Sequence, residues 1–309
     1  MDHMLYNKVL SDKQFGFIGG RSTSLQLLKA LDAWTKIMDD GGYLDIIYMD
    51  FAKAFDKVPH NRLIGKIASY GFRNPVLRWI KYFLSDRKQR VIVNGCPSQW
   101  ENVISGIPQG SVLGPVLFVI YINDMPTCVT SDVYLFADDT KISRDVSKPG
   151  EHQKLQENLN KLVMWSNTWL LKFNTAKCKV LPLRRKADKE ILPQYTMGSD
   201  ENTHILDCAS AEKDIGVYID TDLSFEKHIN EKVNKANMIV GIIRRTYSYL
   251  DIENFLLLYK ALVRPNLEYA SSVWQPYKVK DIDILENVQR RAQQLDKFQR
   301  LKGFLIRIG

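Results

Sequence analysis

The sequence predicts an α+β fold in which a mixed α/β body is followed by a helical C-terminal unit. Short β-branched and aromatic runs alternate with amphipathic helical patterns up to about Asp220, and only helical patterns follow from Phe225 onward. The 309 residues are enough for two or three packed units. With 45% hydrophobic and 25% charged residues, the composition is that of a folded protein, not a disordered one.

The body opens with a helix and a buried strand. The helix is predicted to start after Ser22-Thr23-Ser24 and to end at Gly41-Gly42. Apolar residues recur at helical spacing between these signals, at Leu25, Leu28, Leu31, Trp34 and Met38. Residues 43–49 are β-branched and aromatic after a glycine pair, which predicts a buried strand with Asp50 at its end.

The next segment is predicted to hold three helices and a hairpin. Leu63, Ile64 and Ile67 lie before Gly71, which is a typical C-cap glycine, and Pro75 opens a second helix. The hairpin is expected to pair residues 88–94 with 100–104 around residues 95–98. Residues 112–122 are apolar on all sides, which indicates a core helix.

The rest of the body contains a second pair of strands around two aspartates. Residues 133–137 and 140–143 flank Asp138 and Asp139 in a strand–turn–strand pattern. Further elements are expected as a helix through 155–169, strands at 179–183 and 215–219, and helices at 229–243, 255–262 and 282–295. Residues 186–211 have little periodicity and are predicted to form a long loop.

Charge, cysteine content and apolar stretches indicate the cellular compartment and the type of partner. Lysine and arginine number 43 and aspartate and glutamate 35, so the net charge of +8 weakly favours a polyanionic partner. The four cysteines show no C-x-x-C spacing, which favours free thiols in a reducing compartment. The longest apolar stretch, 112–122, is too short to span a bilayer. We therefore expect an intracellular protein of the nucleus or cytoplasm, not secreted and without a membrane partner.

Three aspartates are the candidate catalytic residues. Transfer of a nucleotide to a sugar hydroxyl is promoted by two Mg²⁺ ions about 3.5–4 Å apart, and Mg²⁺ prefers hard oxygen ligands. Asp50 ends one predicted strand, and Asp138 and Asp139 occupy the turn of a predicted hairpin. If these strands are neighbours, all three carboxylates meet at one edge of the sheet. An Asp-Asp pair alone is ordinary turn chemistry, so the assignment depends on the motifs around it.

At these residues the sequence resembles the reverse transcriptases of non-LTR (LINE-type, jockey-like) retrotransposons. Residues 47–60 (IYMDFAKAFDKVPH), 105–115 (SGIPQGSVLGP) and 136–139 (FADD) resemble the first, second and third catalytic motifs of the family, in the family's order. Residues 17–23 (FIGGRST) resemble the motif ahead of the palm, and the similarity continues through 212–217 to 288–291. The resemblance thus covers nearly the whole chain.

The resemblance implies a right-hand polymerase fold: partial fingers at 1–42, a palm with a small antiparallel sheet and packed helices at 43–222, and a helical thumb at 223–309. Asp50 and Asp138 would bind two Mg²⁺ ions, for which Mn²⁺ could substitute, and Asp139 would be a supporting carboxylate. Phe55 would be the steric gate that leaves no space for a 2′-hydroxyl, although a core position is its alternative. Phe51, Gln109 and Gly110 would contact the incoming deoxynucleotide, although the Pro-Gln-Gly sequence alone is only a turn.

Basic residues complete the implied site. Lys177 resembles the lysine that protonates the leaving pyrophosphate, and Lys179 is the alternative for this role. Residues 215–219 resemble the primer-grip hairpin, and Lys235, Arg244 and Arg245 would contact a template–primer duplex from the thumb, if they are not simply a solvated helix face. The partners implied are an RNA template, a DNA primer and deoxynucleotides.

The chain departs from the family pattern at both ends. The fingers residues expected near the triphosphate have no counterpart in 1–14, and residues 293–309 diverge from the pattern, so we expect an N-terminally truncated copy. The alternative to an RNA-directed DNA polymerase is a catalytically inactive, nucleic-acid-binding remnant with the same palm. An RNA-copying polymerase or an intron maturase is disfavoured by Phe55 and by the absence of a maturase-like extension.

Overall fold

The computed structural model describes residues 4, 6–7, 9–184, 194–198, 203–247 and 249–293. Contacts divide the chain into two units, Met1–Ala209 and Ser210–Gly309. The sequence analysis set the boundary after residue 222. The contact division lies earlier because the hairpin of β12 and β13 packs on the first helix of the second unit. The names palm, fingers and thumb remain predictions.

The first unit is built on a five-stranded sheet of order β11-β8-β1-β7-β6. Four of its strands are β1 (Leu44–Met49), β6 (Asp132–Phe136), β7 (Asp139–Asp145) and β8 (Lys179–Leu183), and β6 forms one edge of the sheet. These strands pair antiparallel, as expected for the predicted palm. The edge strand β11 (Asp207–Cys208) pairs parallel with β8, so the sheet is mixed and not purely antiparallel.

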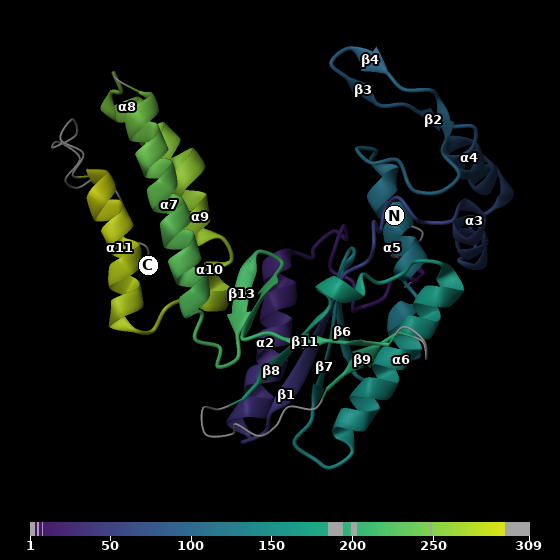
Figure 1. Cartoon of the computed structure of the whole chain (residues 1–309), viewed down its shortest axis with the longest axis horizontal. Coiled ribbons are helices and arrows are strands. Elements are labelled where there is room, and N and C mark those ends of the chain that lie inside the picture. Colours follow the sequence, from purple (N-terminus) through teal and green to yellow (C-terminus); the bar gives the residue numbers. More distant parts are fainter. Residues whose placement is uncertain are drawn as a thin grey trace. The chain divides into compact units, whose positions relative to one another are not determined.

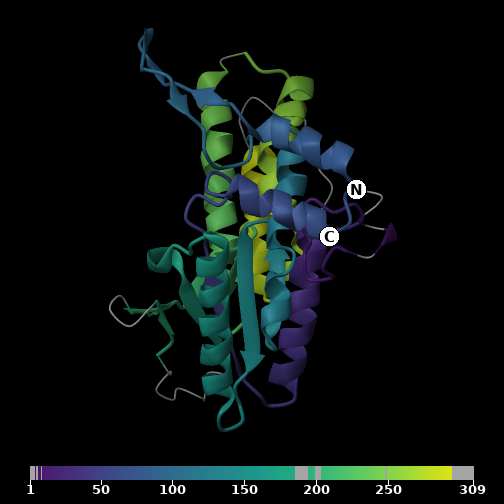
Figure 2. The same cartoon turned by 90° about the vertical axis from the view of Figure 1, so that its right-hand side faces the viewer.

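Helices cover both faces of this sheet (Figures 1 and 2). α2 (Thr23–Asp39) lies on the face of β7 that carries Ser143, whose hydroxyl accepts a hydrogen bond from Trp34 Nε1 at 3.1 Å. α6 (Glu151–Trp169) lies on the opposite face, which carries Arg144. Successive strand residues point to opposite faces, so the period-two alternation of β7 separates the two helices.

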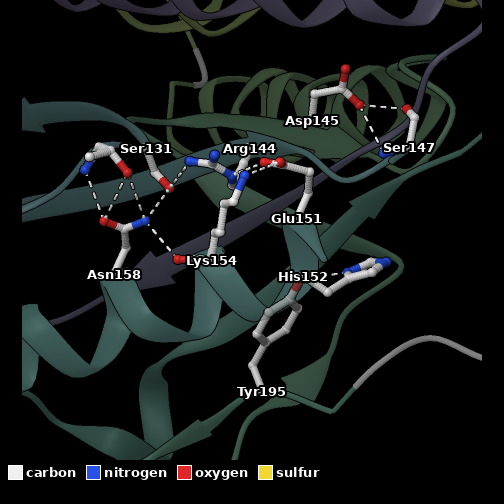
Figure 3. A network of polar contacts seen from close by, with 10 residues as sticks. Ser131, Arg144, Asp145, Ser147, Glu151, His152, Lys154, Asn158 and Tyr195 are labelled. Atoms are coloured by element: carbon white, nitrogen blue, oxygen red, sulfur yellow. Dashed lines mark hydrogen bonds and ion pairs between the residues drawn. The ribbon is translucent and has the colours of Figure 1, made fainter. Parts of the chain in front are cut away.

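A polar network fastens α6 to the sheet (Figure 3). Arg144 Nε donates to Glu151 at 2.5 Å, and Lys154 Nζ donates to the other oxygen of Glu151 at 2.6 Å. Asn158 donates to Ser131 Oγ at 3.1 Å and to the carbonyl oxygen of Lys154 at 2.7 Å. These bonds satisfy polar groups on the buried side of α6 and so fix its register against β7.

The segment between β1 and β6 leaves the sheet and returns to it. It contains α3 (His60–Ser69), α4 (Asn74–Leu84), α5 (Leu113–Ile122) and the short η1 (Met125–Cys128). Between α4 and α5, β2 (Lys88–Gln89) pairs with β5 (Glu101–Asn102) and β3 (Ile92–Val93) with β4 (Cys96–Pro97). The predicted hairpin is confirmed, with a tighter turn at Asn94-Gly95. α5 is buried on nearly all sides, as its sequence predicts.

Two predictions from the sequence are wrong. Residues 186–211 are not a long loop in their described part, because it contains β9 (Thr196–Met197), β10 (His204–Ile205) and β11. These strands of two residues are too short for periodicity to reveal. Ile215 is also not in a strand: β12 (Ala211–Asp214) and β13 (Val217–Asp220) are joined by Ile215-Gly216, both with positive φ.

The second unit is helical after this hairpin, as predicted. Its elements are α7 (Glu226–Thr246), α8 (Ile252–Leu258), η3 (Tyr259–Val263, a π-helical turn), α9 (Arg264–Glu268), α10 (Ser271–Trp274) and α11 (Val279–Gln293). The backbone N–H of Tyr218 donates to His228 Nδ1 at 3.2 Å, which ties α7 to β13. The predicted helix at 282–295 extends past the described residues, and α11 is described to Gln293.

Candidate active site

The two strand ends predicted to carry the aspartates are neighbours. β1 and β7 pair antiparallel with Met49 opposite Thr140. Asp50 follows β1 directly, and Asp138 lies in the turn between β6 and β7, next to Ala137, whose φ is +54°. Asp139 begins β7 opposite Phe136 and is exposed, whereas Asp138 is half-buried. All three aspartates therefore lie where the paired strands β1, β6 and β7 begin or end, at the same end of the sheet.

The charges at this edge influence each other. Burial raises the pKa of Asp138, its backbone hydrogen bond lowers it, and the nearby charge of Asp50 raises it further. Lys177, in η2 (Thr175–Lys177), places Nζ 3.1 Å from Asp50 Oδ2. Lys179, the alternative lysine, lies on β8 opposite Tyr48. Lys177 therefore forms an ion pair with the carboxylate of Asp50.

The aspartates at this end of the sheet are chemically suited to a divalent metal ion. Carboxylate oxygens are the ligands that Mg²⁺ prefers, and two carboxylates that repel each other form a natural cation site. Asp50 and Asp138 meet both conditions. Within the described residues, however, no group of three or more His, Cys, Asp or Glu side chains is arranged to hold a metal ion. The structure thus brings together two of the three predicted ligands as an interacting pair.

The first and second motifs are braced against each other. The backbone N–H of Ile107 donates to the carbonyl oxygen of Phe55 at 2.8 Å, and that of Gly106 donates to Val58 at 2.9 Å. At Gly106, with φ +88°, an added Cβ would lie 2.6 Å from the carbonyl oxygen of Asp56. A side chain there would separate the two motifs, so the close approach requires glycine.

The predicted nucleotide-contacting residues fall into two groups. Gln109 and Gly110 are exposed, and Gln109 Nε2 donates to Asp56 Oδ1 at 2.9 Å. Phe55 is partly buried and stacks on Phe118 with ring centroids 4.4 Å apart. Phe51 is different, because it is 4% exposed and stacks on Phe173 within the core. Its side chain supports the site from the interior and offers no free surface to a nucleotide.

Asp56 is a site residue to which the sequence analysis assigned no role. Its carboxylate accepts the Gln109 amide, and its carbonyl oxygen accepts the Ser105 hydroxyl at 3.0 Å. It thus positions the loop of the second motif from the first. The sequence shows that Asp56 lies inside the first motif, but it does not indicate that Asp56 binds Gln109.

The second unit carries the predicted nucleic-acid-binding residues on α7. Lys235, Arg244 and Arg245 are all exposed. Lys232, which the sequence analysis did not select, is half-buried; desolvation lowers its pKa, and the charges of Lys213 and Lys235 lower it further. Cations that repel each other in this way favour a bound anion. The sequence does contain a signal for Lys232, because residues three apart on a helix are neighbours and Lys235 follows it at that spacing.

None of the helices in the described part of the chain is long and apolar enough to span a bilayer. Of the four cysteines, Cys96 and Cys208 are exposed, Cys128 is half-buried and Cys178 is buried, and none of them forms a disulfide.

Comparisons with known proteins identify the family of the chain. Residues 1–206 match the family "Reverse transcriptase (RNA-dependent DNA polymerase)". The chain is 27% identical over 305 residues to the probable RNA-directed DNA polymerase from transposon X-element of Drosophila melanogaster, covering 93% of this chain and 32% of that protein. It is 28% identical over 297 residues to the RNA-directed DNA polymerase from mobile element jockey of the same species, covering 89% and 31%. The chain therefore spans about a third of the length of these relatives.

A solved structure shares the fold. Apo telomerase from Candida tropicalis aligns with a TM-score of 0.54 at 11% sequence identity, covering 97% of this chain and 50% of that one. The family match covers most of the first unit, including all three catalytic motifs, and the relatives extend the similarity into the second unit. On these findings, the chain belongs to the reverse transcriptase (RNA-dependent DNA polymerase) family, and its relatives named above come from the mobile elements X-element and jockey.

Proposed function

We propose that this chain is an RNA-directed DNA polymerase that transfers nucleotides from deoxynucleoside triphosphates to a primer 3′-hydroxyl on an RNA template. The observation that carries the proposal is the antiparallel pairing of β1 with β7, which brings Asp50 beside the turn that holds Asp138. Mg²⁺, or Mn²⁺ in its place, would supply activation of the hydroxyl and neutralisation of phosphate charge when held there.

In this proposal, Asp50 and Asp138 hold the cations and Asp139 supports them. Lys177, whose Nζ lies 3.1 Å from Asp50 Oδ2, would supply a positive charge and a proton for the leaving pyrophosphate.

The nucleotide would be selected by the two braced motifs. Phe55 is held by its stack on Phe118, so its ring cannot move aside for a 2′-hydroxyl. Gln109 and Gly110 are exposed at the loop that Asp56 holds, and the open space at Gly110 allows a nucleotide to approach the backbone. Phe51 contributes from the core and not by contact with the nucleotide.

The template and primer would be held by cations of the second unit. Lys213 and Lys235 both repel Lys232, and a phosphate backbone would remove this repulsion. Arg244 and Arg245 add two exposed cations in the last turn of α7. Contacts of this kind carry no sequence preference, because they recognise phosphates and not bases.

The decisive experiment is Mg²⁺-dependent extension of a DNA primer on an RNA template. Wild-type chain should extend the primer, and Asp138→Ala and Asp50→Asn should not, while all three should bind the template–primer duplex. Asp12→Ala, an exposed change on the same unit, is the matched control. If the wild-type chain binds the duplex but does not extend the primer, the result would support the alternative of a catalytically inactive, nucleic-acid-binding remnant. In that case the ion pair between Lys177 and Asp50 would serve no catalytic purpose.

A further inference from the structure

Gln14 is a buried side chain placed against the turn that carries Asp138. Its side chain is fully buried, with 0% exposure. Its amide oxygen Oε1 accepts hydrogen bonds from two backbone N–H groups, that of Ala137 at 2.9 Å and that of Gly16 at 2.7 Å. Because both partners are donors, the amide oxygen and not the nitrogen must face them.

The backbone around Gln14 makes this contact inflexible. The segment of Gln14 runs parallel to β6: the N–H of Phe15 donates to the carbonyl oxygen of Leu135 at 2.8 Å, and the N–H of Leu135 donates to Lys13 at 3.0 Å. At Gly16, an added Cβ would lie only 2.4 Å from the backbone nitrogen of Ala137. The two chains thus approach as closely as glycine permits.

The turn needs such support. Ala137 has φ +54°, a left-handed conformation that costs free energy for any residue with a Cβ. A strained residue directly before a catalytic carboxylate persists only where its surroundings fix it. Gln14 supplies an acceptor for the N–H of this residue, which is itself buried.

The other half of the Gln14 amide indicates why the residue is there. Nε2 is buried and has no hydrogen-bond partner among the described residues. Burying a hydrogen-bond donor without a partner costs free energy. The burial of this side chain must therefore be explained by its other contacts. Its two accepted hydrogen bonds offset this penalty, and one of them ends at the turn.

We propose that Gln14 is a positioning residue that holds the Ala137-Asp138 turn in its left-handed form and so sets where Asp138 meets the metal and substrate. This inference rests on the proposed polymerase function for its catalytic consequence. Its structural part, that the side-chain oxygen of Gln14 fixes the turn, stands independently of that function.

The test compares four variants. Gln14→Met keeps the length of the side chain but removes the acceptor, and Gln14→Glu keeps acceptor oxygens. Gly16→Ala places a methyl group against the backbone nitrogen of Ala137 in the same turn and replaces Gln14→Met should that variant not fold. Asp12→Ala changes a neighbouring exposed residue and is the control.

Three measurements are made on each protein: hydrogen–deuterium exchange of the peptide that contains residues 134–140, binding of Mn²⁺ by electron paramagnetic resonance without nucleic acid, and single-turnover primer extension. In Gln14→Met and Gly16→Ala, exchange at Ala137 should be faster by about tenfold, the ratio that loss of one buried hydrogen bond gives. Mn²⁺ affinity and extension rate should fall together, while affinity for the primer–template duplex stays unchanged. Gln14→Glu should keep most of the protection at Ala137.

The proposal would be overturned if the Ala137 N–H of Gln14→Met exchanged as slowly as in the wild-type chain. It would also be overturned if exchange in this variant became faster evenly over β6 and β7. If the wild-type chain neither binds Mn²⁺ nor extends a primer, the polymerase function fails, and the exchange measurement still decides whether Gln14 fixes the turn.

Discussion

Replacement of Lys66 by methionine should stabilise the protein at neutral pH. Lys66 lies on α3 with only 4% of its side chain exposed. Its ammonium group donates to Asp124 Oδ1 and to the carbonyl oxygen of Tyr121, and lies 3.6 Å from the ring centroid of Trp169. These contacts are favourable, yet burial lowers the pKa of Lys66 from 10.5 to about 8. The cost of desolvating the charge therefore exceeds what the contacts return.

The magnitude follows from this pKa. At about 1.4 kcal/mol per pH unit, the shift corresponds to roughly 3 kcal/mol that the charged form costs the folded state at pH 7. Methionine loses the hydrogen bond to Tyr121, worth about 1 kcal/mol, and leaves Asp124 37% exposed and still bonded to Trp165 Nε1. We expect Lys66→Met to raise the free energy of unfolding by about 1–2 kcal/mol at pH 7.

The pH dependence gives the sharper test. Between pH 8 and 10.5 the unfolded chain keeps the proton on this lysine and the folded chain loses it, so the wild-type protein gains stability as the pH rises. Between pH 7 and pH 10 this gain amounts to about 2.5 kcal/mol, so the advantage of Lys66→Met at pH 7 should become a disadvantage at pH 10. Urea unfolding of both proteins, with Lys81→Met on exposed α4 surface as the control, measures this. A variant that is less stable at pH 7, by an amount independent of pH, would refute the reasoning.

Three further predictions concern single residues. Gly216→Ala should lower the free energy of unfolding of the second unit by more than about 1 kcal/mol, because the glycine has φ +89° and an added Cβ would lie 3.0 Å from the Tyr269 ring; chemical denaturation measures it, and an unchanged midpoint would contradict it. Burial lowers the pKa of His228 from 6.5 to about 3, so the unfolded chain binds a proton that the folded chain does not between these values. Stability should fall as the pH is lowered through this window, and less steeply in His228→Gln; equal slopes for the two proteins in acid titrations followed by circular dichroism would exclude His228 as the cause. Asp56→Ala should raise the KM for deoxynucleotide several-fold with little change in kcat, because it releases Gln109; steady-state primer extension decides, and an unchanged KM would remove Asp56 from the nucleotide site.

Local signals in the sequence predicted much of the fold. The helix predicted after Ser22-Thr23-Ser24 is confirmed as α2, which begins at Thr23 and is capped by Ser22, whose side chain accepts the N–H of Leu25. The all-apolar segment 112–122 forms the buried helix α5. Ile215 was placed in a strand because its side chain favours one, but the two-residue turn with Gly216 overrides that preference. β9, β10 and β11 were missed because two residues show no alternation.

The candidate site was predictable only as far as its motifs reach. The motifs predicted Asp50 and Asp138 and left Lys177 and Lys179 as alternatives, and the structure places Lys177 beside Asp50. They did not separate Phe51, which is in the core, from Phe55, which borders the site. Asp56 and Gln14 act through partners 53 and 123 residues away in the chain. No local pattern encodes contacts of that kind, because they arise only when the sheet closes.

The long segment that connects β1 to β6 also has a consequence for folding. α3, α4, the hairpin and α5 all form between the strand that ends at Asp50 and the turn that holds Asp138. Closing so long a loop is slow relative to forming its helices. The two carboxylates therefore come together late, and any opening of β7 from β1 separates them before the helices melt. Loss of catalysis should thus precede loss of helical signal on heating or in denaturant, which would make polymerase activity the earliest indicator that the sheet has begun to open.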